Sequence, residues 1–179
     1  MDGVHIYERL LPDAAADEVE RALLAPDFPW YFAPNTSAPD TATRPDDAPQ
    51  MVHGLWAGGQ TLSKAARYAL GVAGQVGAAP AHVLRAKANL LLPDGRTGHH
   101  LPHTDDARPH WALVYAVTDS DGDTVFFRDG EVACRVPPRR GGAVLFDGRL
   151  LHASSSPTRG PRVVLNLNID KAAPIRLPG

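Results

Sequence analysis

The sequence predicts a mainly β protein in which N-terminal helices flank a double-stranded β-helix, or jelly roll. Helical spacing of apolar residues occurs only within the first 80 residues. Beyond residue 80 the chain consists of short apolar or alternating runs, which Gly, Pro and Asp separate. Strands and helices do not alternate along the chain, which disfavours a parallel doubly wound sheet. An antiparallel jelly roll or similar barrel is therefore expected.

Two helices are expected in the first part of the chain. The first begins at Asp13 and ends before Pro26, and its apolar residues recur at helical spacing: Ala16, Val19, Leu23 and Leu24. The second lies within "TLSKAARYALGVAGQVG" and ends at a glycine. Pro80 marks the boundary to the strands, because the residues that follow it change from helical to alternating periodicity.

Strands are expected in six runs after Pro80: "VLRAKANLLLP", "HWALVYAVTD", "TVFFRDG", "EVACRVPP", "GGAVLFDG" and "RVVLNLNID". The segment Ala33–Gln50 is rich in Pro, Asp, Thr and Ala, and we expect a long irregular loop there. Loops of this length often serve as lids or binding loops. We expect a single domain over residues 1–179, with a helical part at about 1–80 and a jelly-roll core at about 81–170.

Composition narrows the function classes. The chain has 44% hydrophobic and 21% charged residues and a net charge of −2, so no basic surface for nucleic acid is indicated. The single cysteine, Cys134, excludes an intramolecular disulfide and a cysteine-rich zinc site. No apolar run is long enough to span a bilayer, and the first residues lack the order of a signal peptide. We expect a cytoplasmic protein with no membrane partner.

The segment "TGHHLPHTDDARPH" contains half of the eight histidines of the chain. His103 and Asp105 are two positions apart, so on extended backbone they point to the same face and can share one ion. His99 and His100 are adjacent and would face opposite ways. These two are expected in a loop near the mouth of a site, and no role follows from the sequence for His110.

A metal site needs at least a third ligand, and His152 is the best candidate because it ends a strand and precedes the small polar run "ASSS". His103, Asp105 and His152 would form a two-histidine, one-carboxylate facial arrangement. That arrangement is typical of non-heme Fe(II) with open coordination positions. Three open positions leave room for a cosubstrate and O₂.

Arg162 lies ten positions beyond His152 and opens the strand "RVVLNLNID". With it, the stretch from Val83 to Asp170 resembles the Fe(II)- and 2-oxoglutarate-dependent dioxygenases, and within them the prolyl-4-hydroxylase-like branch. The resemblance implies that His103, Asp105 and His152 bind Fe(II). It also implies that Arg162 holds the distal carboxylate of 2-oxoglutarate, for which its planar fork is suited.

Two further residues are candidates for the cosubstrate pocket. Asn89 resembles a polar family position, and its alternative is a backbone bond at a strand end. Tyr115 is a candidate cosubstrate contact, although a core tyrosine fits the alternation equally well. Position 168 is Asn where nucleic-acid demethylases of the family carry a second Arg, which disfavours a nucleic-acid substrate. Halogenating relatives lack the carboxylate present here as Asp105.

The resemblance implies an oxygenase that uses O₂ and 2-oxoglutarate, with ascorbate as a reductant, to hydroxylate a C–H bond. A small molecule such as an amino acid or natural-product intermediate is the leading substrate class, and a peptide is the alternative. Two other readings remain open: a cupin-like metal protein that does not use 2-oxoglutarate, and a 2-oxoglutarate sensor without turnover. The sequence predicts no oligomeric state.

Overall fold

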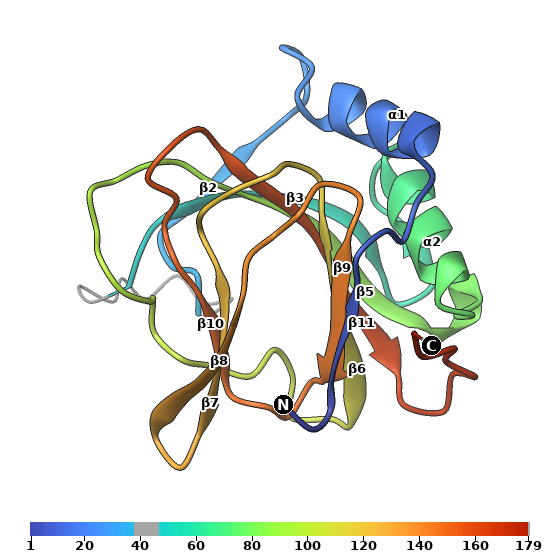
Figure 1. Ribbon diagram of the computed structural model, residues 1–179. Coiled ribbons are helices and arrows are strands. Elements are labelled where there is room, and N and C mark those ends of the chain that lie inside the picture. Colours follow the sequence, from blue (N-terminus) through green and yellow to red (C-terminus); the bar gives the residue numbers. More distant parts are fainter. Residues whose placement is uncertain (38–46, 179) are drawn as a thin grey trace.

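The computed structural model of the protein describes residues 1–37 and 47–178. Two helices and a short 3₁₀ turn accompany two antiparallel sheets (Figure 1). The elements, in chain order, are β1 (Val4–Tyr7), α1 (Asp13–Leu23), β2 (Tyr31–Ala33), β3 (Gln50–Ala57), β4 (Gln60–Thr61), α2 (Ala66–Gln75), η1 (Pro80–His82), β5 (Val83–Leu91), β6 (His110–Ala116), β7 (Thr124–Arg128), β8 (Glu131–Val136), β9 (Ala143–Asp147), β10 (His152–Ser154) and β11 (Arg162–Asp170).

The larger sheet has the strand order β1-β9-β6-β11-β5-β3-β2, with β4 paired to β3. The smaller sheet has the order β10-β7-β8. Figure 1 shows both helices on one side of the larger sheet, and the β7–β8 hairpin away from them. This antiparallel double sheet is the jelly roll that the sequence predicts, and all six runs expected after Pro80 form strands.

The main hydrophobic core lies between the helices and the larger sheet. Helix α1 buries Ala16, Val19 and Leu23, which are spaced so that they share one face. Helix α2 ends before Gly77, whose φ of +90° is the left-handed conformation that a glycine adopts readily. Among the described residues, no helix is long and apolar enough to cross a bilayer.

The N-terminal part differs from the expectation of a helical segment, because it also contains β1, β2, β3 and β4. Three of these strands span only four, three and two residues, too few for alternation to be recognised. β3 is longer, but its register shifts between Gly54 and Trp56, which interrupts the alternation. The middle of the expected loop Ala33–Gln50 lies outside the described residues, and its flanks are the ends of β2 and β3.

Candidate active site

The site lies on the face of the larger sheet that is turned away from the helices, which we call the inner face. Strand β11 pairs with β5 on one side and β6 on the other, with Asn166 opposite both Lys87 and Val114. Paired residues share a face, so each such row runs across the sheet. The odd-numbered residues of β11, Val163 to Ile169, belong instead to the helix-side core. The alternation expected for "RVVLNLNID" is thereby confirmed.

His103 and His152 are brought together by backbone pairing. The two residues form an isolated antiparallel bridge, in which each amide N–H donates to the other residue's carbonyl oxygen, at 2.8 and 3.0 Å. Directly opposed residues of such a pair project to the same side, and the two ring centroids are 4.8 Å apart. Asp105 joins them from the following turn, and one ligand atom of each of the three residues lies within 4.8 Å of the others.

The hydrogen bonds of the two imidazoles leave the nitrogens needed for a metal free. His103 Nδ1 is 3.1 Å from the carbonyl oxygen of Leu101, and His152 Nδ1 is 2.9 Å from that of Leu150. A carbonyl oxygen only accepts, so each Nδ1 carries the proton and each Nε2 keeps its lone pair. Backbone carbonyls commonly orient metal-binding histidines in this way.

Asp105 fits a cation as well. Its Oδ1 is 3.2 Å from Arg85 Nη2, while its buried Oδ2 has no hydrogen-bond partner among the described residues. Burial alone would raise the pKa of Asp105, but the charges of His152 and Arg85 outweigh that effect and lower the pKa to about 2. Burial lowers the pKa of His152 to about 4. The carboxylate is therefore ionised and the imidazole neutral at pH 7, the states in which both ligate a divalent metal.

Arg162 lies in the same cavity, at the start of β11, with only 4% of its surface exposed. Its Nε donates to the carbonyl oxygen of Gly122 at 2.8 Å, and its Nη2 donates to Thr124 Oγ1 at 3.0 Å. Nη1 makes no hydrogen bond within the described part of the chain. Burial lowers the pKa of Arg162 to about 10, so the guanidinium stays charged at neutral pH and fixed by its two contacts.

One cavity connects these groups. It is lined by residues from the inner face, from β10 and from the flanks of the β2–β3 connection: Thr36, Gln50, Lys87, Asn89, Leu91, His103, Val114, Thr124, His152, Ala153, Ser154, Arg162, Val164 and Asn166. Asn89 is among them, and its Nδ2 donates to Gln50 Oε1 at 2.6 Å. Its Oδ1 is buried and unpartnered among the described residues, so it is an acceptor available to the cavity.

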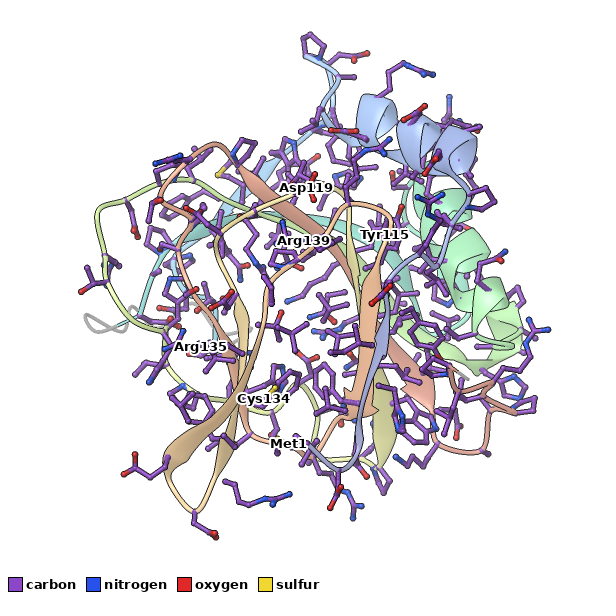
Figure 2. The ribbon with its side chains drawn as sticks, in the orientation of Figure 1. Met1, Tyr115, Asp119, Cys134, Arg135 and Arg139 are labelled. Atoms are coloured by element: carbon purple, nitrogen blue, oxygen red, sulfur yellow. The ribbon has the colours of Figure 1, made fainter. Side chains whose placement is uncertain are left out.

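Tyr115 is not brought to this cavity, which corrects the expectation of a cosubstrate contact there. Its neighbours Val114 and Ala116 are on the inner face, so alternation turns Tyr115 to the opposite face. There it is fully buried in the helix-side core (Figure 2), where burial raises its pKa to about 12. The alternative weighed from the sequence, a core tyrosine, is the observed one.

The remaining histidines of the segment have different environments. His100 is buried, and its two ring nitrogens each lie 2.9 Å from a hydroxyl oxygen, of Ser154 and of Ser156. It ties the loop to β10 rather than exposing a ring at the mouth. His99 is exposed and packs edge-on against Phe127. His110 is completely buried, and a Cβ placed on Gly148 would lie 2.0 Å from its Nε2. The His110 ring therefore packs where only a glycine at position 148 leaves room for it.

Four residues of the site were not singled out from the sequence. Gly122 and Thr124 hold Arg162, and Arg85 and Lys87 lie on the inner face of β5. The polar residues of "RAKAN" recur with a period of two between alanines, which was the available signal for β5. No signal marked Gly122 as more than part of a turn, because its role is played by its backbone carbonyl.

A larger, mostly apolar cavity of about 430 Å³ adjoins the first one. It lies between β8 and the β1–β9 edge, and Val114 and Thr124 line both cavities. Arg135 and Arg139, labelled in Figure 2, belong to its wall. None of the three clustered metal-ligand candidates lines it. The smaller cavity, which His103 and His152 line, is therefore the candidate active site.

Solved structures share this arrangement of strands. A 2OG-Fe(II) oxygenase family oxidoreductase from Burkholderia pseudomallei matches with a TM-score of 0.65 at 15% identity, over 96% of this chain and 86% of that one. A prolyl hydroxylase from Trichoplax adhaerens, solved with a hypoxia-inducible-factor peptide, matches with a TM-score of 0.67 at 13% identity, over 96% and 85%. The fold is that of the 2-oxoglutarate–Fe(II) oxygenases.

The same fold occurs in enzymes of small-molecule metabolism. The α-ketoglutarate-dependent epimerase SnoN from nogalamycin biosynthesis matches with a TM-score of 0.63 at 16% identity, over 98% of this chain and 79% of that one. No protein-family model and no curated protein matches the chain. At these identities the likeness to the oxygenases concerns the fold, and the chemistry has to be argued from the side chains.

Proposed function

We propose that the protein is a cytoplasmic Fe(II)- and 2-oxoglutarate-dependent oxygenase that hydroxylates a C–H bond of a small molecule. The observation that carries the proposal is the joint placement of four side chains. His103, Asp105 and His152 form a cluster of three metal-ligand candidates whose ligand atoms are free. Arg162 lines the same cavity as the two histidines, and its guanidinium is held by a hydrogen bond to the Gly122 carbonyl oxygen. The same four residues carry the resemblance in the sequence.

Each residue has a distinct task in this proposal. His103, Asp105 and His152 would hold the metal on one side and leave its other positions open. Arg162 would bind the distal carboxylate of the cosubstrate through Nη1. Asn89 would line the same cavity, where its Oδ1 could accept a hydrogen bond from a bound water or hydroxyl group. Bound Fe(II) with 2-oxoglutarate supplies the O₂-dependent oxidation. The neutral His152 and the ionised Asp105 need no proton loss before a metal binds.

A small molecule is favoured over a peptide by the site itself. The cavity that joins Arg162 to the histidines has a free volume of about 50 Å³ and is lined from both sheets and from the flanks of the β2–β3 connection. A compact cavity suits a small compound, whereas a peptide needs an extended groove. Among proteins of this fold, one was solved with a peptide and another is an epimerase of nogalamycin biosynthesis, so a peptide substrate is the alternative.

The first experiment compares two adjacent aspartates. Purified protein with Fe(II), ascorbate and 2-oxoglutarate is expected to release succinate, and Mn(II) is expected to bind in a ratio of about one to one. Asp105→Ala should lower metal affinity and succinate release by at least about 100-fold, more than the usual effect of residues that merely support a ligand. Asp106→Ala is the matched control, because Asp106 forms an ion pair with Arg108 outside the ligand set.

The outcomes separate the competing functions. Metal binding without any effect of 2-oxoglutarate would indicate a cupin-like metal protein. Binding of both metal and 2-oxoglutarate without succinate, with every candidate substrate tried, would indicate a sensor. Wild-type protein that binds no metal, or an Asp105→Ala variant that behaves like Asp106→Ala, would remove the proposal.

A further inference from the structure

Lys87 is a cation on the floor of the cavity that the proposed chemistry does not use. It lies on the inner face of β5, between Arg85 and Asn89, and faces Asn166 on β11 and Gly54 on β3 across the pairing. Lys87 makes no hydrogen bond and no ion pair with the described residues. A partly buried ammonium without a partner is costly, so such a group is usually matched by something that binds.

No carboxylate in the described ranges 1–37 and 47–178 forms an ion pair with Lys87. The acid of the proposed ligand set, Asp105, already pairs with Arg85 at 3.2 Å. Burial, with the neighbouring charge of Arg85 as a second cause, lowers the pKa of Lys87 to about 8. The charge of Asp105 opposes that shift, so Lys87 stays mostly protonated at neutral pH, but it makes no direct contact with a carboxylate of the described residues.

The cosubstrate does not supply the missing charge. If the proposed function holds, the charges of a divalent metal and Arg162 together already balance those of Asp105 and the two carboxylates of 2-oxoglutarate. Arg85 and Lys87 then leave the loaded site with excess positive charge. Lys87 is also four residues from Arg162 in register, or roughly 13 Å along the strands, and the Arg162 side chain turns to β7. One carboxylate cannot bridge both cations.

Strand β3 carries no side chain directly opposite Lys87. Its register partner there is Gly54, which has no side chain and is exposed. A Cβ at Gly54 would lie 3.5 Å from Leu62, a leucine with 57% of its surface exposed. A molecule placed over Gly54 would therefore lie between an apolar side chain, Leu62, and the ammonium group of Lys87.

We propose that Lys87 binds a carboxylate group of the primary substrate, so that the substrate is a small acid with an apolar body. The acid would be seated on Lys87, with Asn166 beside it, and the body would lie over Gly54 against Leu62. This inference rests on the proposed function for the word substrate, but the anion site itself is a property of β5 and β3.

The test uses a matched pair of probes that differ only in charge, hexanoate and hexanamide. Both are titrated by calorimetry into wild-type protein, Lys87→Met and Lys87→Arg, each loaded with Mn(II) and 2-oxoglutarate under argon. Wild type is expected to bind hexanoate at least about tenfold more tightly than hexanamide. Lys87→Met should abolish that preference, Lys87→Arg should keep it, and all three proteins should bind 2-oxoglutarate with the same affinity.

Three results would overturn the inference. One is wild-type protein that does not prefer the acid, and another is Lys87→Met that binds hexanoate like wild type. The third is Lys87→Met that weakens 2-oxoglutarate instead, which would assign Lys87 to the cosubstrate. If Mn(II) and 2-oxoglutarate do not bind, the proposed function fails, and the acid–amide comparison is then made on metal-free protein, where it still decides the role of Lys87.

Discussion

Strands β5 and β11 present opposite chemistry on their two faces. The helix-side face carries alanines and leucines that are almost completely buried: Ala86, Ala88, Leu165 and Leu167. The inner face of the same strands carries charged and amide side chains: Arg85, Lys87, Asn89, Arg162, Asn166 and Asn168. Because strand residues alternate between faces, two strands supply both the core of the fold and the floor of the site.

The difference shows in unpaired polar atoms. Eight buried side-chain nitrogens and oxygens lack a partner among the described residues. Four of these eight belong to the inner face or to the turn that follows His103: Arg85 Nε, Asn89 Oδ1, Asp105 Oδ2 and Asn166 Oδ1. Unpaired buried polar groups are costly and few in native proteins, so their gathering at one place marks a site that a ligand completes. The apolar face supplies the stability that offsets this cost.

The largest expected difference between the two faces is in stability, when a side chain on the helix-side face is truncated. Leu165→Ala is expected to lower the free energy of unfolding by about 3 kcal/mol, because it leaves a void in a closed core. Asn166→Ala, the next residue on the opposite face, should change it by no more than about 0.5 kcal/mol, since its amide oxygen has no partner to lose. Urea unfolding of metal-free protein measures both. Equal losses would contradict the division between the faces.

Removal of the fixed guanidinium should affect the cosubstrate. Arg162→Ala is expected to weaken 2-oxoglutarate binding by about 30-fold, or roughly 2 kcal/mol, because a charge-assisted pair of hydrogen bonds is lost. Arg159→Ala, an exposed arginine three positions earlier, should leave the affinity unchanged. The dissociation constant of 2-oxoglutarate with Mn(II)-loaded protein is the measurement. An unchanged constant in Arg162→Ala would show that Arg162 does not bind the cosubstrate.

Much of this division can be predicted from the sequence. Six of the seven strands after Pro80 follow from short apolar or alternating runs, and the two faces of β11 follow from alternation. The nearness of His103 to Asp105 follows from their spacing. His152 was the best candidate for a third ligand from its place after a strand, but the backbone bridge that joins it to His103 across 49 residues was not predictable from local sequence. Tyr115 shows the limit of such predictions. Alternation indicates that successive residues point to opposite faces of a strand, but it does not indicate which of the two faces lines the site.

The N-terminal strands and the contacts that hold Arg162 were not predictable. β1 pairs with β9, far along the chain, and its four residues carry no period of their own. Gly122 acts through its carbonyl oxygen, which every residue type possesses. Arg85 pairs with Asp105 across a long connection, and no local pattern specifies such a partner. Non-local contacts and backbone roles lie beyond what residue type and spacing encode.

The ion pair between Arg85 and Asp105 should stabilise the site before a metal binds. Arg85→Met leaves a buried carboxylate unpaired and is expected to cost metal-free protein about 1.5 kcal/mol, less than a fully buried pair because Arg85 is 32% exposed. Mn(II) should reduce that loss, since the ion provides the counter-charge. Arg96→Met removes an exposed pair with Asp94 and is the control. A loss of the same size with and without Mn(II) would contradict a shared role for Asp105.

The smallest effect concerns a buried polar group on the site side that is fully paired. His100 has both ring nitrogens bonded, and burial lowers its pKa to about 4 although Asp47 and Asp94 oppose the shift. Below pH 6.5 the unfolded chain takes up a proton that the folded chain refuses, so stability falls as the pH drops from about 6.5 to about 4. His100→Gln cannot titrate and should show a shallower decline, by about 1 kcal/mol at about pH 5.8.

His99→Gln is the matched control, because His99 is exposed and makes no contact with β10. It is expected to keep the wild-type dependence of unfolding free energy on pH, measured by urea titration between pH 4 and pH 8. If His100→Gln also keeps that dependence, the two serine hydroxyls must accommodate a protonated ring in the folded state. The buried His100 would then respond to pH as the exposed His99 does, and burial with two hydrogen bonds would not set the protonation state of a histidine in this site.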